Sequence, residues 1–418
     1  MWNRRIALAF VLAIAASAAD PAQSGRKALD LLLARKFAAF TQLLAPAAKE
    51  TLTVAFLNQR TGPELDGFGA LQQVGTPLIA DNMVSFPVRF ERVTVNIQLT
   101  LDKTGQVAGL FFRPADSPLP PQWKHPPYSK PDAFREQEVT IGAGEWKLPG
   151  TLTTPKSQPP HAAILLVHGP GPNDRDETMY SNRMFKDLAE GLATRGFTVL
   201  RYDKRTKVYG ERMAGTSFTL QQETVDDAVS ALALLRQQPE VLPQRVFLIA
   251  HSLGGYAMPR IAARDGKLAG AILLAANARP IEDVVLDQNE TAARQRANDP
   301  AARLRMEQLK AEVAKVKALI TPAALGLPAA YWRDLQNYHP AQEARRLPFP
   351  MLFLQGEQDT QVTMRDFDTW KSALANQKNA QFHSYPDLNH LFQSGDLRVP
   401  GNVASEVIER IATWITTR

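Results

Sequence analysis

The stretch from Val246 to Met258, which reads VFLIAHSLGGYAM, constrains the fold of this chain more than any other. Its first five residues are apolar and favour a buried strand, and the glycine pair favours a helix packed closely against that strand. Ser252 stands at the turn between them, in the context of the G-x-S-x-G nucleophile motif, with Ala250 in the place of the first glycine. The sequence therefore predicts a nucleophilic serine at the end of a strand. The alternative is a serine that only caps a helix, beside glycines that serve packing alone.

The composition limits the classes of protein to which this chain can belong. With 418 residues and 44% hydrophobic content, the chain can bury a large core, and its length indicates two or three domains. The 48 Lys and Arg against 42 Asp and Glu leave a net charge of +6 without a concentrated basic run, so no nucleic-acid partner is expected. The chain has no cysteine, which excludes a disulfide and a thiolate nucleophile.

Residues 1–19 have the pattern of a signal peptide. Two arginines, Arg4 and Arg5, precede an apolar run from Ile6 to Ala16, and small residues follow at the expected cleavage site. The run is short for a membrane span, so we expect an exported protein, periplasmic or secreted, with no membrane partner after cleavage. An uncleaved membrane anchor is the alternative.

Residues 25–114 predict a small α+β domain. We expect helices at 28–44 and 47–58, and strands at 82–90, 92–101 and 106–112. No catalytic constellation is visible there. The prolines of residues 115–134 then predict an extended, semi-rigid linker between domains.

Residues 135–418 have the pattern of an α/β domain. After a hairpin at 138–154, short apolar runs without alternation recur at 162–167, 198–202, 246–250, 271–274 and 351–354, with helical stretches between them such as 184–194 and 224–236. Strands of this kind are buried on both faces, so we expect a mostly parallel sheet flanked by helices. Residues 278–347 interrupt the repeat with helical spacing and predict a lid over an active site; the alternative is a solvated excursion with no role in catalysis.

A glycine-rich turn, HGPGPNDRD, starts at His168, directly after the first of those runs. In enzymes with this motif order, such a turn supplies a backbone N–H for an oxyanion. Pro170 has no N–H, so we expect Gly171 to be one donor and Leu253, which follows the nucleophile, to be the other. The alternative is a tight turn whose glycines serve backbone geometry only.

A carboxylate and a histidine follow the last two strands. Asp359 ends a turn after the strand at 351–354, and His390 lies in the loop after a strand expected at 381–385. Ser252, Asp359 and His390 thus occur in the order nucleophile, acid, base, each behind a core strand. Other carboxylates compete with Asp359 for the role of acid: Glu357, Asp366 and Asp368.

On these motifs, residues 135–418 resemble bacterial α/β-hydrolase serine esterases that carry H-G-S-G-P-x-D-R-D and G-H-S-x-G-G. Here the two motifs read HGPGPNDRDE and AHSLGG, and the segment YDKR at 202–205 also matches. Residues 25–114 resemble the small cone-shaped α+β domain of unknown function that precedes some of these hydrolases. The resemblance implies that the cluster Asp174, Arg175 and Asp176 braces its loop and does not react.

Motifs and resemblance together predict a serine carboxylesterase. Ser252 would attack an ester carbonyl, the N–H groups of Leu253 and Gly171 would hold the oxyanion, His390 would transfer the proton, and Asp359 would orient His390. The expected partner is a small-molecule ester, and the chemistry needs no metal and no organic cofactor. Because the same residues serve other acyl transfers, a peptidase or thioesterase is an alternative, as is a non-catalytic binding protein on a hydrolase scaffold. The sequence leaves the acyl and alcohol preferences and the oligomeric state open.

Overall fold

The computed structural model describes residues 20–418 except 81, 103, 117–122, 295–299 and 319–322. The expected signal peptide, 1–19, lies outside the described residues. The described part divides into two compact units at the boundary between residues 122 and 123, and each unit has its own hydrophobic core.

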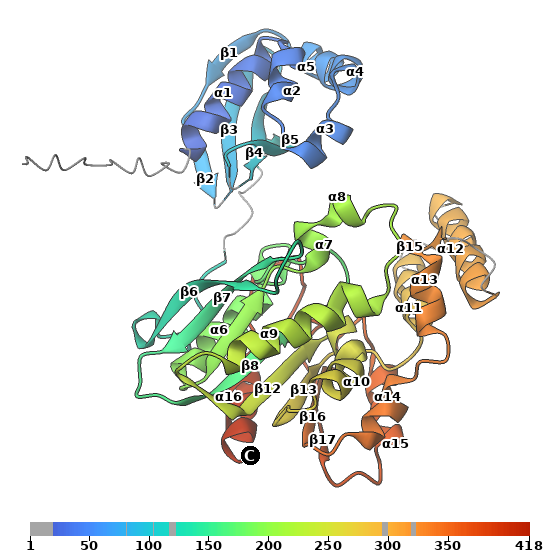
Figure 1. Ribbon diagram of the computed structural model, residues 1–418. Helices are drawn as coiled ribbons and strands as arrows, with labels where there is room; N and C mark the ends of the chain where they lie inside the picture. The colour runs from blue at the N-terminus through green and yellow to red at the C-terminus, as the bar shows by residue number, and fades with distance from the viewer. Residues whose placement is uncertain (1–19, 81, 103, 117–122, 295–299, 319–322) are drawn as a thin grey trace, which may run out of the picture. The chain divides into compact units, whose positions relative to one another are not determined.

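The first unit is α+β (Figure 1). Its helices are α1 (Pro21–Leu33), α2 (Phe37–Gln42), α3 (Pro46–Thr51), α4 (Val54–Phe56) and α5 (Gly62–Phe68). Its antiparallel strands are β1 (Leu71–Val74), β2 (Leu78–Ala80), β3 (Met83–Phe90), β4 (Thr94–Leu101) and β5 (Val107–Pro114), in the order β1-β3-β4-β5 with β2 paired to β3. Alternate residues of β3 and β4, such as Phe86 and Ile97, pack with Leu29 of α1 in the core.

The helix expected at 28–44 is two helices, so that prediction is wrong in detail. Arg35 lies between them with φ at 58°, a left-handed conformation that a continuous right-handed helix does not allow. Its guanidinium donates to the Gly62 carbonyl at 2.8 Å and to Asp66 at 2.6 Å, which holds the chain in this turn. The expectation failed because the apolar spacing continues across the break.

An eight-stranded sheet organises the second unit, in the order β17-β16-β13-β12-β8-β11-β7-β6 (Figure 1). Its strands are β6 (Phe134–Ile141), β7 (Leu148–Pro155), β8 (His161–Val167), β11 (Thr198–Tyr202), β12 (Val241–His251), β13 (Gly270–Leu274), β16 (Met351–Gly356) and β17 (Ala380–Tyr385). The neighbours from β17 to β11 pair in parallel, and the edge hairpin of β7 and β6 is antiparallel. The predicted mostly parallel sheet is confirmed.

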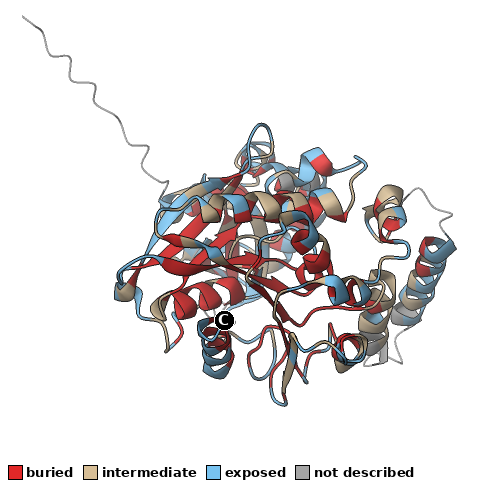
Figure 2. Ribbon diagram, turned by 60° about the horizontal axis from the view of Figure 1, so that its bottom comes forward, coloured by how far each residue is buried: buried red, intermediate tan, exposed pale blue. Residues whose placement is uncertain are grey.

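Helices cover both faces of this sheet. Neighbouring residues of a strand point to opposite faces of the sheet. Leu165 and Leu248 lie in the hydrophobic core on one face, which three helices cover. Ile164 and Ile249 lie in the core on the other face, which two helices cover. The first face carries α9 (Asp226–Arg236), α10 (Leu253–Asp265) and α15 (Met364–Ala373); the second carries α6 (Met184–Thr194) and α16 (Ser405–Thr416). Figure 2 shows the strands and the inner sides of these helices as buried. Strands buried on both faces explain the continuous apolar runs in the sequence.

Short elements occupy the connections. They are β9 (Thr178–Met179), β10 (Asn182–Arg183), α7 (Arg205–Val208) and α8 (Gly210–Met213). Between β13 and β16 lie α11 (Ile281–Arg294), α12 (Pro300–Ala318), β14 (Ala323–Ala324), β15 (Leu327–Pro328), α13 (Ala329–Leu335) and α14 (Pro340–Glu343), which make up most of segment 278–347. Among the described helices, none has both the length and the apolar content needed to cross a membrane.

Residues 123–130, here called the strap, pack onto the second unit. The Trp123 indole N–H donates to Asp187 on α6 at 2.8 Å, and the Tyr128 hydroxyl donates to the Val403 carbonyl at 2.8 Å. The strap lies within the expected semi-rigid linker 115–134. Its aromatic side chains are anchored on α6 and the segment before α16.

Candidate active site

Ser252 occupies the turn between β12 and α10, with φ at 53° and ψ at −118°. This backbone conformation is strained for any residue other than glycine, and it persists only where the surrounding structure holds the residue in place. The N–H of Ser252 donates to the Leu274 carbonyl at the end of β13, 3.0 Å away. The turn is therefore fixed to the neighbouring strand, and the serine is 7% exposed.

The glycines after Ser252 permit close packing of α10. A Cβ on Gly254 would lie 2.5 Å from the Val167 carbonyl oxygen, and one on Gly255 would lie 2.3 Å from the Ala276 Cβ. Neither position has space for a side chain. Ala250, in the place of the first motif glycine, is fully buried in the strand.

His390 and Asp359 form a buried pair. The Nδ1 atom of His390 lies 2.6 Å from Oδ2 of Asp359, and both side chains are at most 3% exposed. The other carboxylate oxygen accepts from the N–H groups of Gln361 at 2.7 Å and Val362 at 2.9 Å. A carboxylate held in this way fixes the imidazole with its proton on Nδ1 and leaves Nε2 for proton transfer.

The competing carboxylates have other partners or face solvent. Asp366 is buried and binds the Arg279 guanidinium at 2.8 Å, and Glu357 accepts from the Ser384 hydroxyl at 2.7 Å. Asp368 is exposed. Of the four candidates for the acid, the structure thus pairs Asp359 with the histidine.

The nucleophile turn and the histidine loop are adjacent, although no hydrogen bond joins Ser252 to His390 within the described residues. Their contact runs through His251, whose Nε2 lies 3.2 Å from the His390 carbonyl oxygen. The two imidazole rings are 4.6 Å apart between centroids. Catalytic hydrogen bonds are often long without substrate and tighten when substrate binds.

The two expected oxyanion donors line the same pocket as Ser252. Gly171 has φ at 89°. Its carbonyl oxygen accepts a hydrogen bond from the Thr206 hydroxyl at 2.8 Å, which anchors this residue of the loop. Leu253 is the first residue of α10, where helix N–H groups have no partner in the helix. In the described part of the chain, neither N–H makes a hydrogen bond, so both remain available to a ligand.

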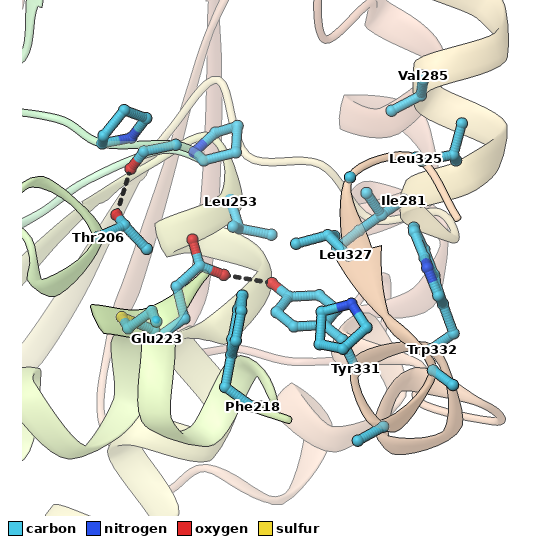
Figure 3. Close-up of a pocket in the computed structure, with 18 of the residues that line it drawn as sticks. Thr206, Phe218, Glu223, Leu253, Ile281, Val285, Leu325, Leu327, Tyr331 and Trp332 are labelled. Carbon is cyan, nitrogen blue, oxygen red and sulfur yellow. Dashed lines mark hydrogen bonds between the residues drawn. The ribbon is translucent and has the colours of Figure 1, made fainter. Parts of the chain in front are cut away.

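The pocket has a volume of about 960 Å³, and its walls are largely apolar and aromatic (Figure 3). Side chains from segment 278–347 form one wall, and Leu253 and Phe218 lie across from it. That wall includes Ile281, Val285, Leu325, Leu327, Tyr331 and Trp332. His390 and Asp359 are not among the lining residues, so Ser252 is the member of the expected triad that faces the pocket.

The chain is similar in sequence to known proteins. The model of the alpha/beta hydrolase family matches residues 164–399. The chain is also 37% identical over 341 residues to Esterase EstD of Thermotoga maritima, an alignment that covers 79% of each protein. The chain belongs to the alpha/beta hydrolase family.

Solved structures similar to this hydrolase include two esterases. The esterase domain of a Rhodothermus marinus protein is 20% identical, with 67% of this chain and 97% of that chain covered and a TM-score of 0.42. Est1E from Butyrivibrio proteoclasticus is 16% identical, with 67% and 99% covered and a TM-score of 0.45.

A buried charge network joins the pocket wall of the hydrolase to its glycine-rich loop. The Lys204 ammonium donates to Glu223 at 2.6 Å and to the Gly169 carbonyl at 2.8 Å. The other oxygen of Glu223 accepts from the Tyr331 hydroxyl at 2.5 Å (Figure 3). Burial and the nearby Glu223 charge raise the pKa of Tyr331, so its phenol remains a neutral donor. The roles of these residues were not predicted from the sequence; the YDKR match was the signal for Lys204.

Ion pairs between the Asp174–Asp176 cluster and neighbouring side chains support the predicted role of this cluster in bracing its loop. Arg175 binds Asp203 at 3.1 Å, and Asp176 pairs with Arg201. In the described part of the chain, no group of three or more His, Cys, Asp and Glu residues is placed to hold a metal ion.

Proposed function

We propose that this hydrolase is a serine esterase that cleaves carboxylic esters through an acyl-enzyme on Ser252. The observation that carries the proposal is the position of Ser252, on a strained turn at the wall of a 960 Å³ apolar pocket. The buried pair of His390 and Asp359 beside that turn supplies a base with an orienting acid. The 37% identity to an esterase supports ester cleavage over the thioesterase and peptidase alternatives.

In the proposed reaction, His390 accepts the Ser252 proton on Nε2 while the serine oxygen attacks the ester carbonyl carbon. The N–H groups of Leu253 and Gly171 donate to the resulting oxyanion. When the C–O bond to the alcohol breaks, His390 gives its proton to the leaving oxygen. A water molecule then attacks the acyl-enzyme in the same way and releases the acid. Asp359 keeps the Nδ1 proton in place throughout.

Two further points belong to the same proposal. Segment 278–347 contributes a wall of the pocket, which supports its role as a lid over Ser252. The pattern of residues 1–19 supports export to the periplasm or the medium.

Replacement of Ser252 by alanine tests the proposal. We expect the wild-type protein to release p-nitrophenol from short and medium acyl esters, and S252A to lose this activity by at least about 10⁴-fold because it cannot form the acyl-enzyme. Ser230→Ala, on α9, is the matched control and retains the wild-type rate. Equal rates for wild type and S252A would reject the esterase assignment, and activity confined to thioesters or peptides would support the alternative hydrolases.

The acid is tested by Asp359→Asn. The amide has the size of the carboxylate but favours the wrong imidazole tautomer, so we expect kcat for the same esters to fall by about 10³- to 10⁴-fold. Asp368→Asn, which removes an exposed carboxylate of α15, leaves kcat unchanged. If D359N kept more than a tenth of the wild-type kcat, another group would have to orient His390.

A further inference from the structure

Glu177 is a buried carboxylate at the end of the Asp174–Asp176 loop. It is 4% exposed, and its φ of 48° is a conformation that a glutamate adopts only where its surroundings hold it. One carboxylate oxygen accepts from the Gly169 N–H at 2.6 Å. A Cβ on Gly169 would lie 3.2 Å from that oxygen and 3.3 Å from the Ser252 Cβ, so Gly169 is packed between the carboxylate and the nucleophile.

The other carboxylate oxygen forms an ion pair with His251. It lies 3.0 Å from Nδ1, and the two side chains are 5% and 2% exposed. The second ring nitrogen of His251 lies 3.2 Å from the His390 carbonyl oxygen. Both ring nitrogens therefore lie near acceptors: Nε2 faces the carbonyl oxygen, and Nδ1 is within ion-pair distance of the carboxylate without hydrogen-bond geometry. A buried carboxylate at this distance favours the protonated imidazole, which carries a positive charge. The arrangement indicates an imidazolium against a carboxylate, directly behind Ser252.

The surrounding charges favour the same state. Burial on its own lowers the pKa of His251, but the Glu177 charge, the His390 carbonyl and Asp359 raise it, and the net shift is upward. Burial raises the pKa of Glu177, but His251, His168 and the Gly169 N–H lower it, and the net shift is downward. Shifts in these directions favour the charged form of both groups.

We propose that Glu177 is a positioning residue for the proposed esterase reaction: through Gly169, His251 and the His390 carbonyl, it ties the oxyanion loop, the nucleophile turn and the base loop together. The inference rests on the proposed function, because it assigns Glu177 to the reaction at Ser252. Gly169 lies two residues before the expected donor Gly171, and His251 is adjacent to Ser252. Glu177 thus contacts the oxyanion loop and the nucleophile turn directly, at residues that do not themselves react, and reaches the base loop through His251.

Loss of the carboxylate charge is expected to loosen these loops without changing the pocket walls. We expect Glu177→Gln in the full chain to lower kcat for p-nitrophenyl esters by about 10- to 100-fold, while KM stays within about twofold, because small displacements of catalytic groups affect the transition state most. Asp265→Asn is the matched control. Asp265 is a buried carboxylate, 4% exposed, that pairs with Arg236 at 2.6 Å at the far end of α10. Its replacement costs stability but leaves kcat unchanged.

A second measurement detects the protonation state of His251 in the ion pair and does not depend on catalytic activity. In ¹⁵N spectra of histidine-labelled protein at neutral pH, we expect His251 to show two protonated ring nitrogens, with its signals assigned by their absence in His251→Gln. The same ring is expected to become neutral in E177Q. This measurement on the wild type remains decisive if E177Q does not fold.

The outcomes separate the two proposals. A kcat of E177Q within twofold of wild type, or a neutral His251 in the wild type, would overturn the role of Glu177. Absence of ester hydrolysis by the wild type would instead reject the proposed function, and the histidine spectrum would still decide whether the ion pair exists.

Discussion

His168 is a buried histidine that takes no part in the proposed reaction. Its ring lies 4.9 Å from that of Phe185 and 5.1 Å from that of Tyr202, between centroids. Within the described residues, neither ring nitrogen has a hydrogen-bond partner. Burial lowers the pKa of His168 from 6.5 to about 4, so the ring is neutral in the folded protein under ordinary conditions.

This shift predicts an acid-dependent loss of stability. Between pH 6.5 and about 4, the unfolded chain binds a proton at His168 that the folded protein does not, so the stability present above pH 6.5 falls as the pH is lowered. Against His168→Phe, which keeps an aromatic ring and does not titrate, the wild type should lose up to about 3 kcal/mol across this window. Urea unfolding of both proteins at several pH values measures the difference. A difference that does not change with pH would contradict the assigned shift.

The residues of the site differ in how far the sequence can predict them. The nucleophile motif predicted Ser252, and the order of the residues behind core strands then predicted Asp359 and His390. The structure pairs the last two, and the catalytic roles of all three stay predictions. Glu177 and His251 could not be predicted, because their importance depends on contacts between loops far apart in the sequence.

At the scale of elements, burial decided which predictions succeeded. β8 and β11 match their expected ranges to within one residue, because strands buried on both faces are apolar throughout. β1 and β2 were missed: they are short, and Leu71 and Leu78 are 49% and 52% exposed, so their burial pattern gives no clear periodicity.

Helix α13 provides an element-scale prediction, because the Tyr331 hydroxyl fastens it beside the pocket with a hydrogen bond to a charged group. Tyr331→Phe removes the donor to Glu223 and should lower the free energy of unfolding by about 1.5–3 kcal/mol, the range for a hydrogen bond to a charged group. Tyr338→Phe is the control. It removes a hydrogen bond of 2.9 Å to the neutral Tyr256 carbonyl and should cost only about 0.5–1.5 kcal/mol. Urea unfolding measures both; an equal or larger loss in Y338F would contradict the assignment of a charged partner to Tyr331.

At the scale of the whole molecule, the strap decides where the second unit begins. Asp187 accepts from Trp123, from the Asn402 amide at 3.0 Å and from the Val403 N–H at 2.9 Å. Burial raises the pKa of Asp187 to about 7, although the hydrogen bonds from these donors lower it. The donors therefore stabilise the ionised form of this buried carboxyl group. Glu190 is also buried and accepts from the Ser129 hydroxyl at 2.7 Å. The strap thus satisfies two acidic groups of α6, although its prolines suggested a spacer.

Two truncated proteins test this boundary and the independence of the second unit. A chain that starts at Trp123 keeps the strap and the second core, so we expect it to fold alone and to hydrolyse p-nitrophenyl esters at the rate of the intact protein. A chain that starts at Asp132 loses the donors from Trp123 and Ser129 and the Tyr128 ring. Because buried acceptors left without a partner cost about 1–3 kcal/mol each, its thermal midpoint should fall by at least about 5 °C. Thermal unfolding and ester hydrolysis of both, beside the intact chain, give the comparison. Equal midpoints would show that the strap does not stabilise the second unit, and an inactive chain from Trp123 would show that the first unit takes part in the chemistry.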